Sequence, residues 1–234
     1  MKKNDAKKHV QIWEKVWEGD SYASPRMRKK KAKRKIEELL SMLPEKLTQQ
    51  NVVLDAGCGG GYVSEYLIKR TNVKIIAFDQ SEKAIDICRN LKVSDKMQVL
   101  KADASHIPYD DQTADLALCI GLLEHLRDYD ACIEEIRRIL KKDGYLYVVS
   151  SNKYSAMYIQ WFVKHLLGRW KYGYQKNWTP SQLSRILERH SFRQIELKVI
   201  EGWGNFDSLS QIDRILRKQF KYIGRYVVYL GQKK

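Results

Sequence analysis

Four glycines that follow an apolar run have the spacing that points most directly to chemistry in this chain. Segment 51–62 reads NVVLDAGCGGGY, so the apolar run ends on a carboxylate, Asp55, and then breaks into Gly57, Gly59, Gly60 and Gly61. The pattern predicts a buried strand, a tight turn and the start of a helix. Because glycine has no Cβ, such a turn lets backbone amides approach a nucleotide-like ligand closely.

The register of these glycines distinguishes between two kinds of nucleotide turn. The dinucleotide fingerprint G-x-G-x-x-G needs a third small residue, and the bulky Tyr62 stands at that position. The chain instead has D-x-G-x-G-x-G, which resembles motif I of the class I S-adenosylmethionine-dependent methyltransferases, close to their small-molecule and quinone-type members. The resemblance implies S-adenosylmethionine as methyl donor, S-adenosylhomocysteine as product, and four cofactor-binding residues: Asp55, Gly57, Gly59 and Gly61. On this motif alone, a turn for another cofactor, or one that binds nothing, stays open.

A second acidic residue follows the next apolar run, VKIIAFDQS, at Asp79. An acid about twenty residues beyond the glycines is placed to accept both ribose hydroxyls of a nucleotide. Gln80, directly after it, is a further candidate for cofactor binding. Alternatively, Asp79 or Ser81 caps the helix that comes next. Both functions are compatible, with Ser81 capping and Asp79 facing the ligand.

The family resemblance continues through residues 101–150. It implies that Asp103 hydrogen-bonds the adenine amino group and that the Ala104 amide meets a ring nitrogen. It also implies that the end of the strand 114–120, at Ile120 and Gly121, lines the methionine part of the donor. Four segments match motifs of the family, and they follow one another in the family's order. This favours the methyltransferase interpretation over a glycine turn that arose by chance.

Alternating apolar and helical segments predict the fold. From 51 to 150, five apolar runs alternate with helical stretches, which is typical of a parallel sheet with helices on both faces. Two more strands, near 192–200 and 225–231, complete an α/β, doubly wound, mostly parallel seven-stranded sheet of the Rossmann-like methyltransferase type. In such sheets ligands bind beyond the carboxyl ends of the strands.

Two regions flank the predicted strands. Residues 1–48 are expected to form an N-terminal helical arm over the cofactor site, and residues 49–234 the methyltransferase domain. Within the arm, Tyr22 is a candidate to close the site, while Trp13 and Trp17 are expected mainly to pack the helix onto the sheet. Within the domain, the aromatic and basic segment 153–178 is expected to form a substrate cap.

His125 is the candidate catalytic residue, because it follows the fourth strand and an imidazole suits base chemistry near neutral pH. Glu124 beside it is placed to orient it. A pocket-lining function without proton transfer is the alternative, since the Glu-His pair is widespread in the family and an amine acceptor needs no base. The other histidines lack ligand spacing, and we predict no metal site.

Composition and charge limit the function classes. The chain has 234 residues, 44% of them hydrophobic, which suits one domain with appendages. No apolar run approaches the ~20 residues of a membrane span, and no signal sequence opens the chain, so we expect a cytoplasmic protein. The four scattered cysteines are expected to be buried thiols. The net charge is +15; 26–35 is almost entirely basic, and 144–187 contains no acid.

The acceptor is the open question. Basic and aromatic residues together suit RNA, but the motifs of base methyltransferases are missing. Basic and aromatic residues equally suit the headgroup boundary of a lipid bilayer. If segment 157–167 is helical, apolar side chains cover most of its circumference. We therefore also expect peripheral contact with an anionic membrane. We predict methyl transfer to an O, N or C atom of a small or lipid-like acceptor, with RNA as second candidate. A catalytically inactive cofactor-binding module and a nicotinamide oxidoreductase are the alternatives.

Overall fold

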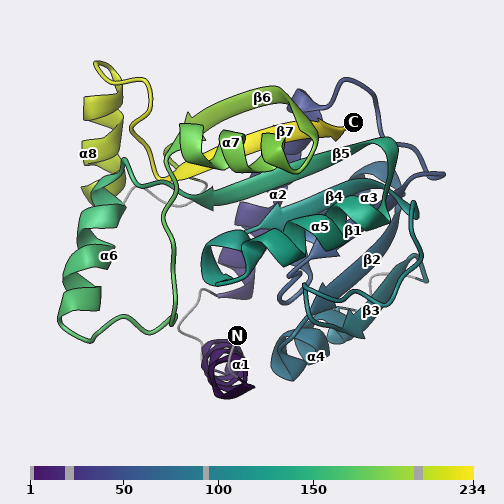
Figure 1. Ribbon diagram of the computed structural model, residues 1–234. Coiled ribbons are helices and arrows are strands. Elements are labelled where there is room, and N and C mark those ends of the chain that lie inside the picture. The colour runs from purple at the N-terminus through teal and green to yellow at the C-terminus, as the bar shows by residue number, and fades with distance from the viewer. Residues whose placement is uncertain (1–2, 19–23, 92–94, 203–207) are drawn as a thin grey trace.

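A seven-stranded sheet forms the centre of the computed structural model, which describes residues 3–18, 24–91, 95–202 and 208–234 (Figure 1). The strands are β1 (Val52–Ala56), β2 (Lys74–Asp79), β3 (Met97–Lys101), β4 (Ala114–Ile120), β5 (Leu140–Ser151), β6 (Phe192–Ile200) and β7 (Tyr226–Lys233). The helices are α1 (Lys3–Glu18), α2 (Pro25–Met42), α3 (Tyr62–Thr71), α4 (Glu82–Asn90), the short 3₁₀ turn η2 (Leu123–His125), α5 (Tyr129–Ile139), α6 (Ala156–Leu166), α7 (Pro180–Arg189) and α8 (Ser208–Arg217).

The strand order is β3-β2-β1-β4-β5-β7-β6. Strands β1 to β5 pair in parallel, and β7 runs antiparallel to both β5 and β6. The chain moves outward from β1 to β3 and then returns to β4, so the order reverses between β1 and β4. This reversal is where sheets of this kind open a crevice for a ligand. The predicted doubly wound, mostly parallel sheet of seven strands is confirmed.

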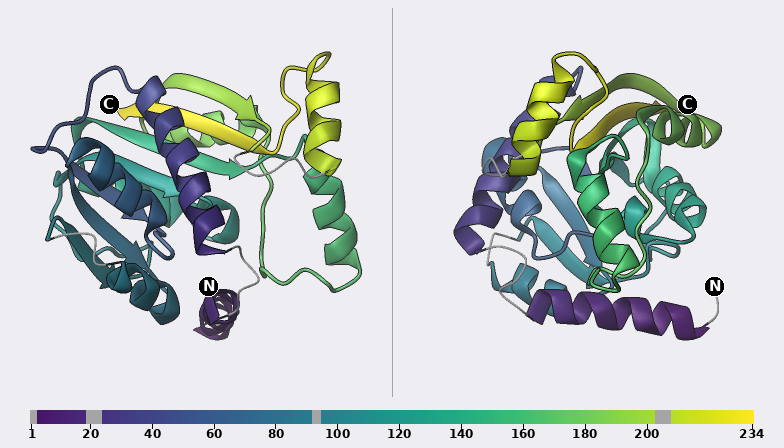
Figure 2. Two further views of the ribbon diagram at one scale, coloured as in Figure 1. Left: turned by 180° about the vertical axis from the view of Figure 1, so that it is seen from behind. Right: turned by 90° about the vertical axis from the view of Figure 1, so that its left-hand side faces the viewer.

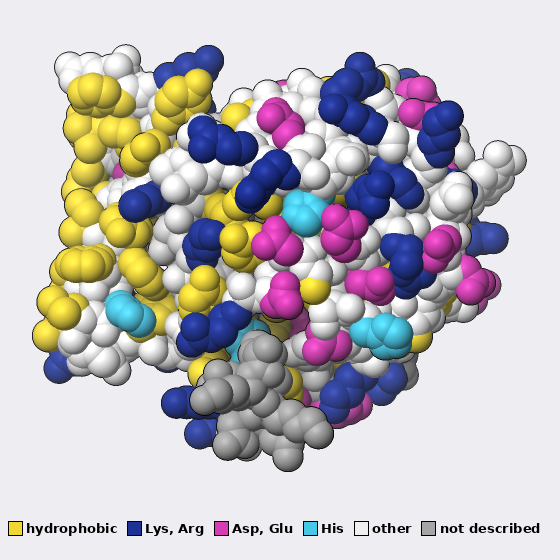
Figure 3. Space-filling model, in the orientation of Figure 1, with side chains coloured by type: hydrophobic (Ala, Val, Ile, Leu, Met, Phe, Trp, Pro, Cys, Tyr) yellow, Lys and Arg dark blue, Asp and Glu magenta, His cyan; other side chains and the backbone are white. Residues whose placement is uncertain are grey.

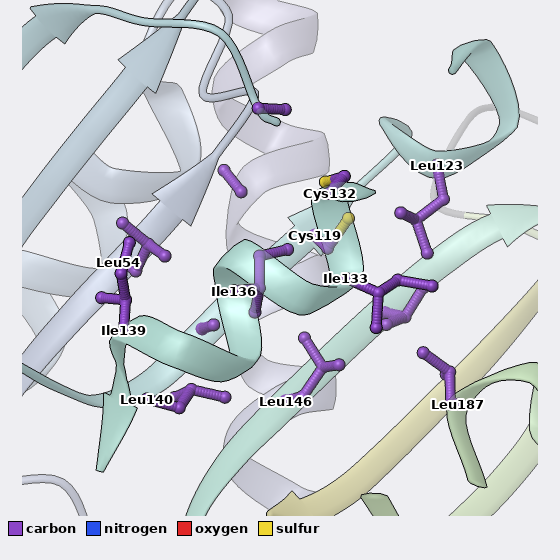
Figure 4. Packing of buried hydrophobic residues seen from close by; sticks show 14 of the residues in the cluster. Leu54, Cys119, Leu123, Cys132, Ile133, Ile136, Ile139, Leu140, Leu146 and Leu187 are labelled. Atoms are coloured by element: carbon purple, nitrogen blue, oxygen red, sulfur yellow. The ribbon is translucent and has the colours of Figure 1, made fainter. Parts of the chain in front are cut away.

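Two apolar layers hold helices to opposite faces of the sheet. Successive side chains of a strand point to opposite faces, so Leu54 of β1 joins one layer and Val53 the other. On one face, Ile133 and Ile136 of α5 pack against the sheet together with α7 (Figure 4). On the other, α2 and α3 cover the strands, with Ile36 fully buried.

The predicted N-terminal arm consists of two helices with different surroundings. Helix α2 is a layer of the domain itself, because Ile36, Leu39 and Met42 are buried on the sheet. Helix α1 instead runs across the carboxyl edge of the sheet and lies against α4 (Figure 2). The division at residue 48 therefore stays a prediction, whereas α1 occupies the position expected of an arm.

The predicted cap segment also has two parts. Helices α6 and α8 stand together beside the sheet (Figures 1 and 2), and the Ala156 amide donates to the buried Asp213 carboxylate over 2.7 Å. The loop after α6 returns to the sheet, where the Trp178 amide donates to the Ser151 carbonyl over 2.9 Å. Asn152 fixes this junction, because its side-chain amide donates to the carbonyls of Tyr222 and Gly224.

Candidate functional site

The carboxyl ends of β1, β2 and β4 open into a crevice that also reaches the first residue of β7. Its lining includes eight of the predicted cofactor-binding residues: Asp55, Gly57, Gly59, Asp79, Gln80, Ala104, Ile120 and Gly121. His125, the predicted base, lines the same crevice. The topology therefore brings together residues that are spread over seventy positions of the sequence.

The glycine turn is fixed by the end of the neighbouring strand. The Cys58 amide donates to the Phe78 carbonyl, and the Gly59 amide donates to Oδ2 of Asp79, both over 2.9 Å. Gly57 and Gly59 have φ of +69° and +53°, which favours glycine. The predicted tight turn between strand and helix is therefore formed by left-handed glycines.

The ring of Trp17 explains why position 59 must be glycine. A Cβ at Gly59 would lie 2.4 Å from Cζ2 of Trp17, which no side chain tolerates. Trp13 and Trp17 of α1 both line the crevice. We expected these tryptophans mainly to pack α1 onto the sheet, but both contact the candidate site instead.

Gly61 has a different function from the other glycines. It is absent from the crevice lining, and a Cβ there would lie 2.3 Å from Sγ of Cys88 on α4. With φ of +73°, Gly61 begins α3 and lets it pack tightly against α4. Gly61, which we predicted to bind the cofactor, therefore has a packing function in the structure.

Asp55 is a buried carboxylate at the end of β1. Its Oδ2 accepts a 2.6 Å hydrogen bond from the Ser64 hydroxyl. Burial raises the pKa of Asp55 to about 6, and the Ser64 hydrogen bond and the charge of Lys35 offset only part of this effect. The folded protein therefore holds Asp55 in a site that disfavours its charge.

Asp79 joins two neighbouring turns as well as lining the crevice. Besides accepting from Gly59, it accepts from the Ser81 amide through Oδ1 over 2.9 Å. Burial raises the pKa of Asp79 despite these two amide donors. Each carboxylate oxygen keeps acceptor capacity, which fits ribose hydroxyls. Ser81 caps α4 by accepting from the Ala84 amide, so both predicted functions are structurally compatible.

The two residues predicted to meet adenine differ in exposure. Ala104 is buried and lines the crevice, whereas Asp103 is exposed and absent from the lining. Oδ1 of Asp103 accepts from both the amide and the hydroxyl of Ser105. Asp103 therefore shapes the turn that presents Ala104, and its contact with adenine stays a prediction. Tyr22 lies outside the described residues.

A backbone carbonyl defines the tautomer of His125. Its Nδ1 lies 3.1 Å from the Tyr174 carbonyl. A carbonyl only accepts, so Nδ1 carries the proton and Nε2 keeps its lone pair. Burial lowers the pKa of His125 below its ordinary value, and the edge of the ring packs against Trp13 at 4.8 Å between centroids. A neutral imidazole with a free lone pair is what a general base requires.

Glu124 does not orient His125, contrary to the expectation from its position. Its buried carboxylate accepts from the Ser150 hydroxyl over 2.7 Å and from the amide and hydroxyl of Ser151. The side chain thus ties η2 to β5. The Tyr174 carbonyl orients the imidazole instead, and the loop that carries it is fixed when the Lys176 amide donates to the Glu124 carbonyl.

Glu14 is a structural residue of the site that sequence reasoning missed. Its carboxylate accepts from the amides of Glu82 and Lys83, at 2.7 and 3.1 Å, which are the unpaired donors at the start of α4. An acid at a helix N-terminus also interacts favourably with the helix dipole. The contact holds α1 over the crevice, and no local motif announces it because the partners lie 68 positions apart.

Four cations in the crevice lining were also missed: Arg28, Lys31, Lys35 and Arg225. Three of them belong to the almost entirely basic run 26–35. Their three- and four-residue spacing places them on one face of α2. The guanidinium of Arg28 lies 5.0 Å from the ring centroid of Trp17 and 5.7 Å from that of Tyr62.

The crevice has the features that S-adenosylmethionine binding needs. Left-handed glycines expose backbone amides, Asp79 offers acceptors for a sugar, and apolar side chains of β4 and α1 line the wall. A Cβ at Gly121 would have no atom of the described residues within 4 Å, so the end of β4 borders open space. The residues present therefore fit the donor.

Comparisons with known proteins give the same result. A family model for the methyltransferase domain matches residues 54–148. The chain is 26% identical to the ubiquinone biosynthesis O-methyltransferase of Pelagibacter ubique, over 75% of this chain and 74% of that protein. It is 38% identical to an Arabidopsis thaliana tRNA (carboxymethyluridine(34)-5-O)-methyltransferase, over 44% of this chain and 25% of that protein.

The fold also resembles that of solved structures. A chain of the Haloferax volcanii complex between the Trm112 methyltransferase activator and a methyltransferase superposes with a TM-score of 0.72. The match covers 96% of both chains at 16% sequence identity. This likeness concerns the fold alone, and it extends to α1 and to the segments after β5.

Replacing Gly61 with alanine should destabilise the protein more than the same change at Gly121. Both residues have φ of +73°, so both variants lose about 1–2 kcal/mol from backbone strain. Only Gly61→Ala adds a clash, with Cys88, for a total of about 2–5 kcal/mol. Urea unfolding measures the difference, and equal losses would show that α3 and α4 do not need this close contact.

Asp55→Asn should stabilise the donor-free protein at pH 8. The pKa of Asp55 is about 6 in the folded chain against an ordinary 3.8, so folding stability falls as pH rises through this range. Asparagine cannot ionise, still accepts from Ser64, and should gain about 1–3 kcal/mol at pH 8. The gain should disappear near pH 4. Thermal unfolding at both pH values tests this, and a pH-independent difference would contradict it.

Proposed function

Because the chain belongs to the class I S-adenosylmethionine-dependent methyltransferases, we propose that it methylates an O, N or C atom of a small or lipid-like acceptor. The observation that carries the proposal is the position of His125 in the same crevice as the residues that fit the donor. Nε2 of His125, which keeps its lone pair, is the atom that we propose to act on the acceptor.

When bound, S-adenosylmethionine supplies a methyl group on a positively charged sulfonium. The acceptor atom forms a bond to the methyl carbon while the carbon–sulfur bond breaks, and its electron pair returns to sulfur. The glycine turn and Asp79 hold the donor in line, and α1 excludes water from it. Where the acceptor atom carries a proton, Nε2 of His125 takes it.

The lipid-like acceptor is supported by a named relative and by a surface. The Pelagibacter relative is named a ubiquinone biosynthesis O-methyltransferase. Exposed apolar residues gather on α6, α8 and the segment after α8, beside the sheet (Figure 3). This α6–α8 apolar face includes Ile159, Phe162, Val163, Leu166, Leu167, Ile212, Ile215, Leu216, Phe220 and Tyr222, all at least 39% exposed. Such a face suits contact with a hydrophobic phase, from which the protein takes up a lipid-like acceptor.

An anionic membrane is the environment we propose for the α6–α8 apolar face. Its exposed charged neighbours include Lys164, Lys218 and Lys221, and the acid within it, Asp213, is buried. Apolar side chains with a basic rim bind the headgroup region of anionic bilayers. None of the helices among the described residues is long and apolar enough to cross a membrane. The contact is therefore proposed as peripheral.

RNA is the second candidate acceptor, favoured by the partial similarity to a tRNA methyltransferase and by the basic surface. Labelled-methyl transfer from S-adenosylmethionine into fractionated cell extract distinguishes the candidates. We expect label in the small-molecule or lipid fraction. Label in RNA alone would replace the proposal with the second candidate. No label in any fraction would favour an inactive cofactor-binding module, and binding of NADH in place of the donor would favour an oxidoreductase.

His125→Ala should slow methyl transfer by about 10²- to 10⁴-fold without changing donor affinity, since general base catalysis contributes this much. In the wild type, the rate should fall at acidic pH because His125 becomes protonated. The pKa of His125 is lower than its ordinary value of 6.5, so the fall should lie below pH 6.5. This acidic limb should be missing in the variant. Rates from pH 5 to 8 and calorimetric donor titration test both points. A variant at full speed would leave His125 with a lining function only.

Leu166→Ser with Ile215→Ser should weaken binding to vesicles that contain phosphatidylglycerol by about tenfold or more, because two side chains that are 76% and 67% exposed no longer insert. Ile195→Ser, at a 36% exposed position on β6, is the matched control and should bind like wild type. Co-sedimentation measures binding. Equal binding of all three proteins, or no preference for anionic over phosphatidylcholine vesicles, would rule out the membrane contact.

A further inference from the structure

A groove lies between α6 and α8, the two helices that stand together beside the sheet (Figure 1). Ile159 of α6 lines it on one side, and Ile212 and Leu216, one turn apart on α8, line it on the other. These three apolar side chains are 65%, 45% and 39% exposed. No described segment of the chain therefore covers the groove, although its walls are apolar.

The polar groups at the buried floor of the groove have partners within the protein. The Asp213 carboxylate accepts from the Ala156 amide over 2.7 Å. The Ser155 hydroxyl donates to the Asn152 carbonyl over 3.2 Å and accepts from the Tyr158 amide over 3.1 Å. A ligand of the groove therefore gains its affinity from the burial of apolar surface and not from hydrogen bonds to the floor.

Lysines and aromatic rings form the mouth of the groove. Lys153 and Lys221 are both exposed and both belong to the lining. Their ammonium groups lie 6.0 Å from the ring centroid of Tyr158 and 5.8 Å from that of Tyr222, respectively. Lysine stems that lie along rings keep their charged ends in water. The groove is therefore apolar inside and basic at its edge, which suits an amphiphile.

The lining of the groove differs from the outer residues of the α6–α8 apolar face. Phe162, Leu166 and Ile215 belong to that face, and none of them lines the groove. A bilayer surface can contact these outer residues, but it does not fill a concave surface between two helices. A single flexible hydrocarbon chain has the shape for this space.

The groove and the crevice meet along the segment before β7. Ile223 lines the groove, and Arg225, two positions later, lines the crevice. Between them, the Gly224 amide donates to the carbonyl of Tyr154, another lining residue of the groove, over 3.0 Å. Consecutive Cα atoms are about 3.8 Å apart, so the two linings approach within about 8 Å along this backbone. One elongated molecule can therefore occupy both.

We propose that the groove binds an apolar chain of the methyl acceptor, while the group to be methylated lies in the crevice. This inference rests on the proposed methyltransferase function and specifies its substrate class, an amphiphile with a hydrocarbon chain. Burial of the chain between α6 and α8 supplies affinity at a distance from the reacting atom. The bound chain also limits the positions that the reacting group can take, which favours alignment with the donor.

The first test uses wild-type protein and decanol, a neutral probe with an apolar chain. In vesicle-free buffer, decanol should displace the fluorescent probe dansylated undecanoic acid from the protein. At the same concentrations, decanol should raise the amount of extract needed for half-maximal methyl labelling by about tenfold or more, with donor affinity unchanged in calorimetry. No binding of the fluorescent probe would overturn the inference. Displacement without an effect on labelling would assign the groove to a membrane lipid and would also overturn it.

The labelled product itself separates this inference from the proposed function. The product should partition into the organic phase when the reaction is extracted with an apolar solvent. A labelled small molecule that stays in the aqueous phase would overturn the inference and leave the methyltransferase function intact. Absence of label in every fraction would instead contradict the proposed function.

The second test uses variants. Ile212→Gln with Leu216→Gln should weaken probe binding and raise the extract demand by about tenfold or more, because amides replace two apolar walls. Ile195→Gln, at an exposed position on β6, is the matched control and should behave like wild type. Leu166→Ser with Ile215→Ser should keep probe binding in vesicle-free buffer, since neither residue lines the groove.

Thermal unfolding checks that each variant is folded, and the decanol experiment needs no variant. Equal probe binding by the groove variant and the Ile195→Gln control would overturn the inference. Gel filtration at rising protein concentration covers the remaining occupant. A dimer that the groove variant abolishes would assign the groove to a second copy of the chain and would overturn the inference as well.

Discussion

The hydrogen bond from the Gly59 amide to the Asp79 carboxylate is the contact on which the candidate site depends. It joins the turn after β1 to the end of β2, and the ring of Trp17 lies directly on the glycine that donates it. Asp79, the glycine turn and α1 therefore form one unit. A change at any of the three alters the other two. Glycine is required at position 59 for two reasons, its left-handed φ and the absence of room for a Cβ.

Several ionisable groups of the crevice have pKa values shifted toward the neutral form, Asp79 among them. Burial raises the pKa of Asp55 and lowers those of Lys35 and His125. A shared direction toward neutrality indicates that the site is desolvated before any ligand arrives. Keeping such groups reduces the stability of the folded chain, as is common at functional sites. In return, electrostatic contacts with a bound donor and acceptor are stronger than they would be in water.

The sequence predicted the sheet and the donor side of the site because both follow from local patterns. Apolar runs, glycines and the residue after each strand are short-range signals, and the sheet places their ends at one edge. The Tyr174 carbonyl and Glu14 could not be predicted in this way. Each meets its partner across 49 or 68 positions, through a loop or helix whose course depends on tertiary packing. We expected Glu124 to orient His125 because the two residues are adjacent in sequence. The buried carboxylate of Glu124 instead accepts a hydrogen bond from β5.

The two halves of the crevice therefore have different origins. The donor half is built from the ends of β1, β2 and β4, all inside residues 54–148, where the family model matches. Arg225, the cationic face of α2 and the loop that carries Tyr174 all lie outside that range. Similarity over the matched residues therefore carries information about the donor and little about the acceptor. The residues that α2, Arg225 and the start of β7 add to the crevice are the better guide to the acceptor.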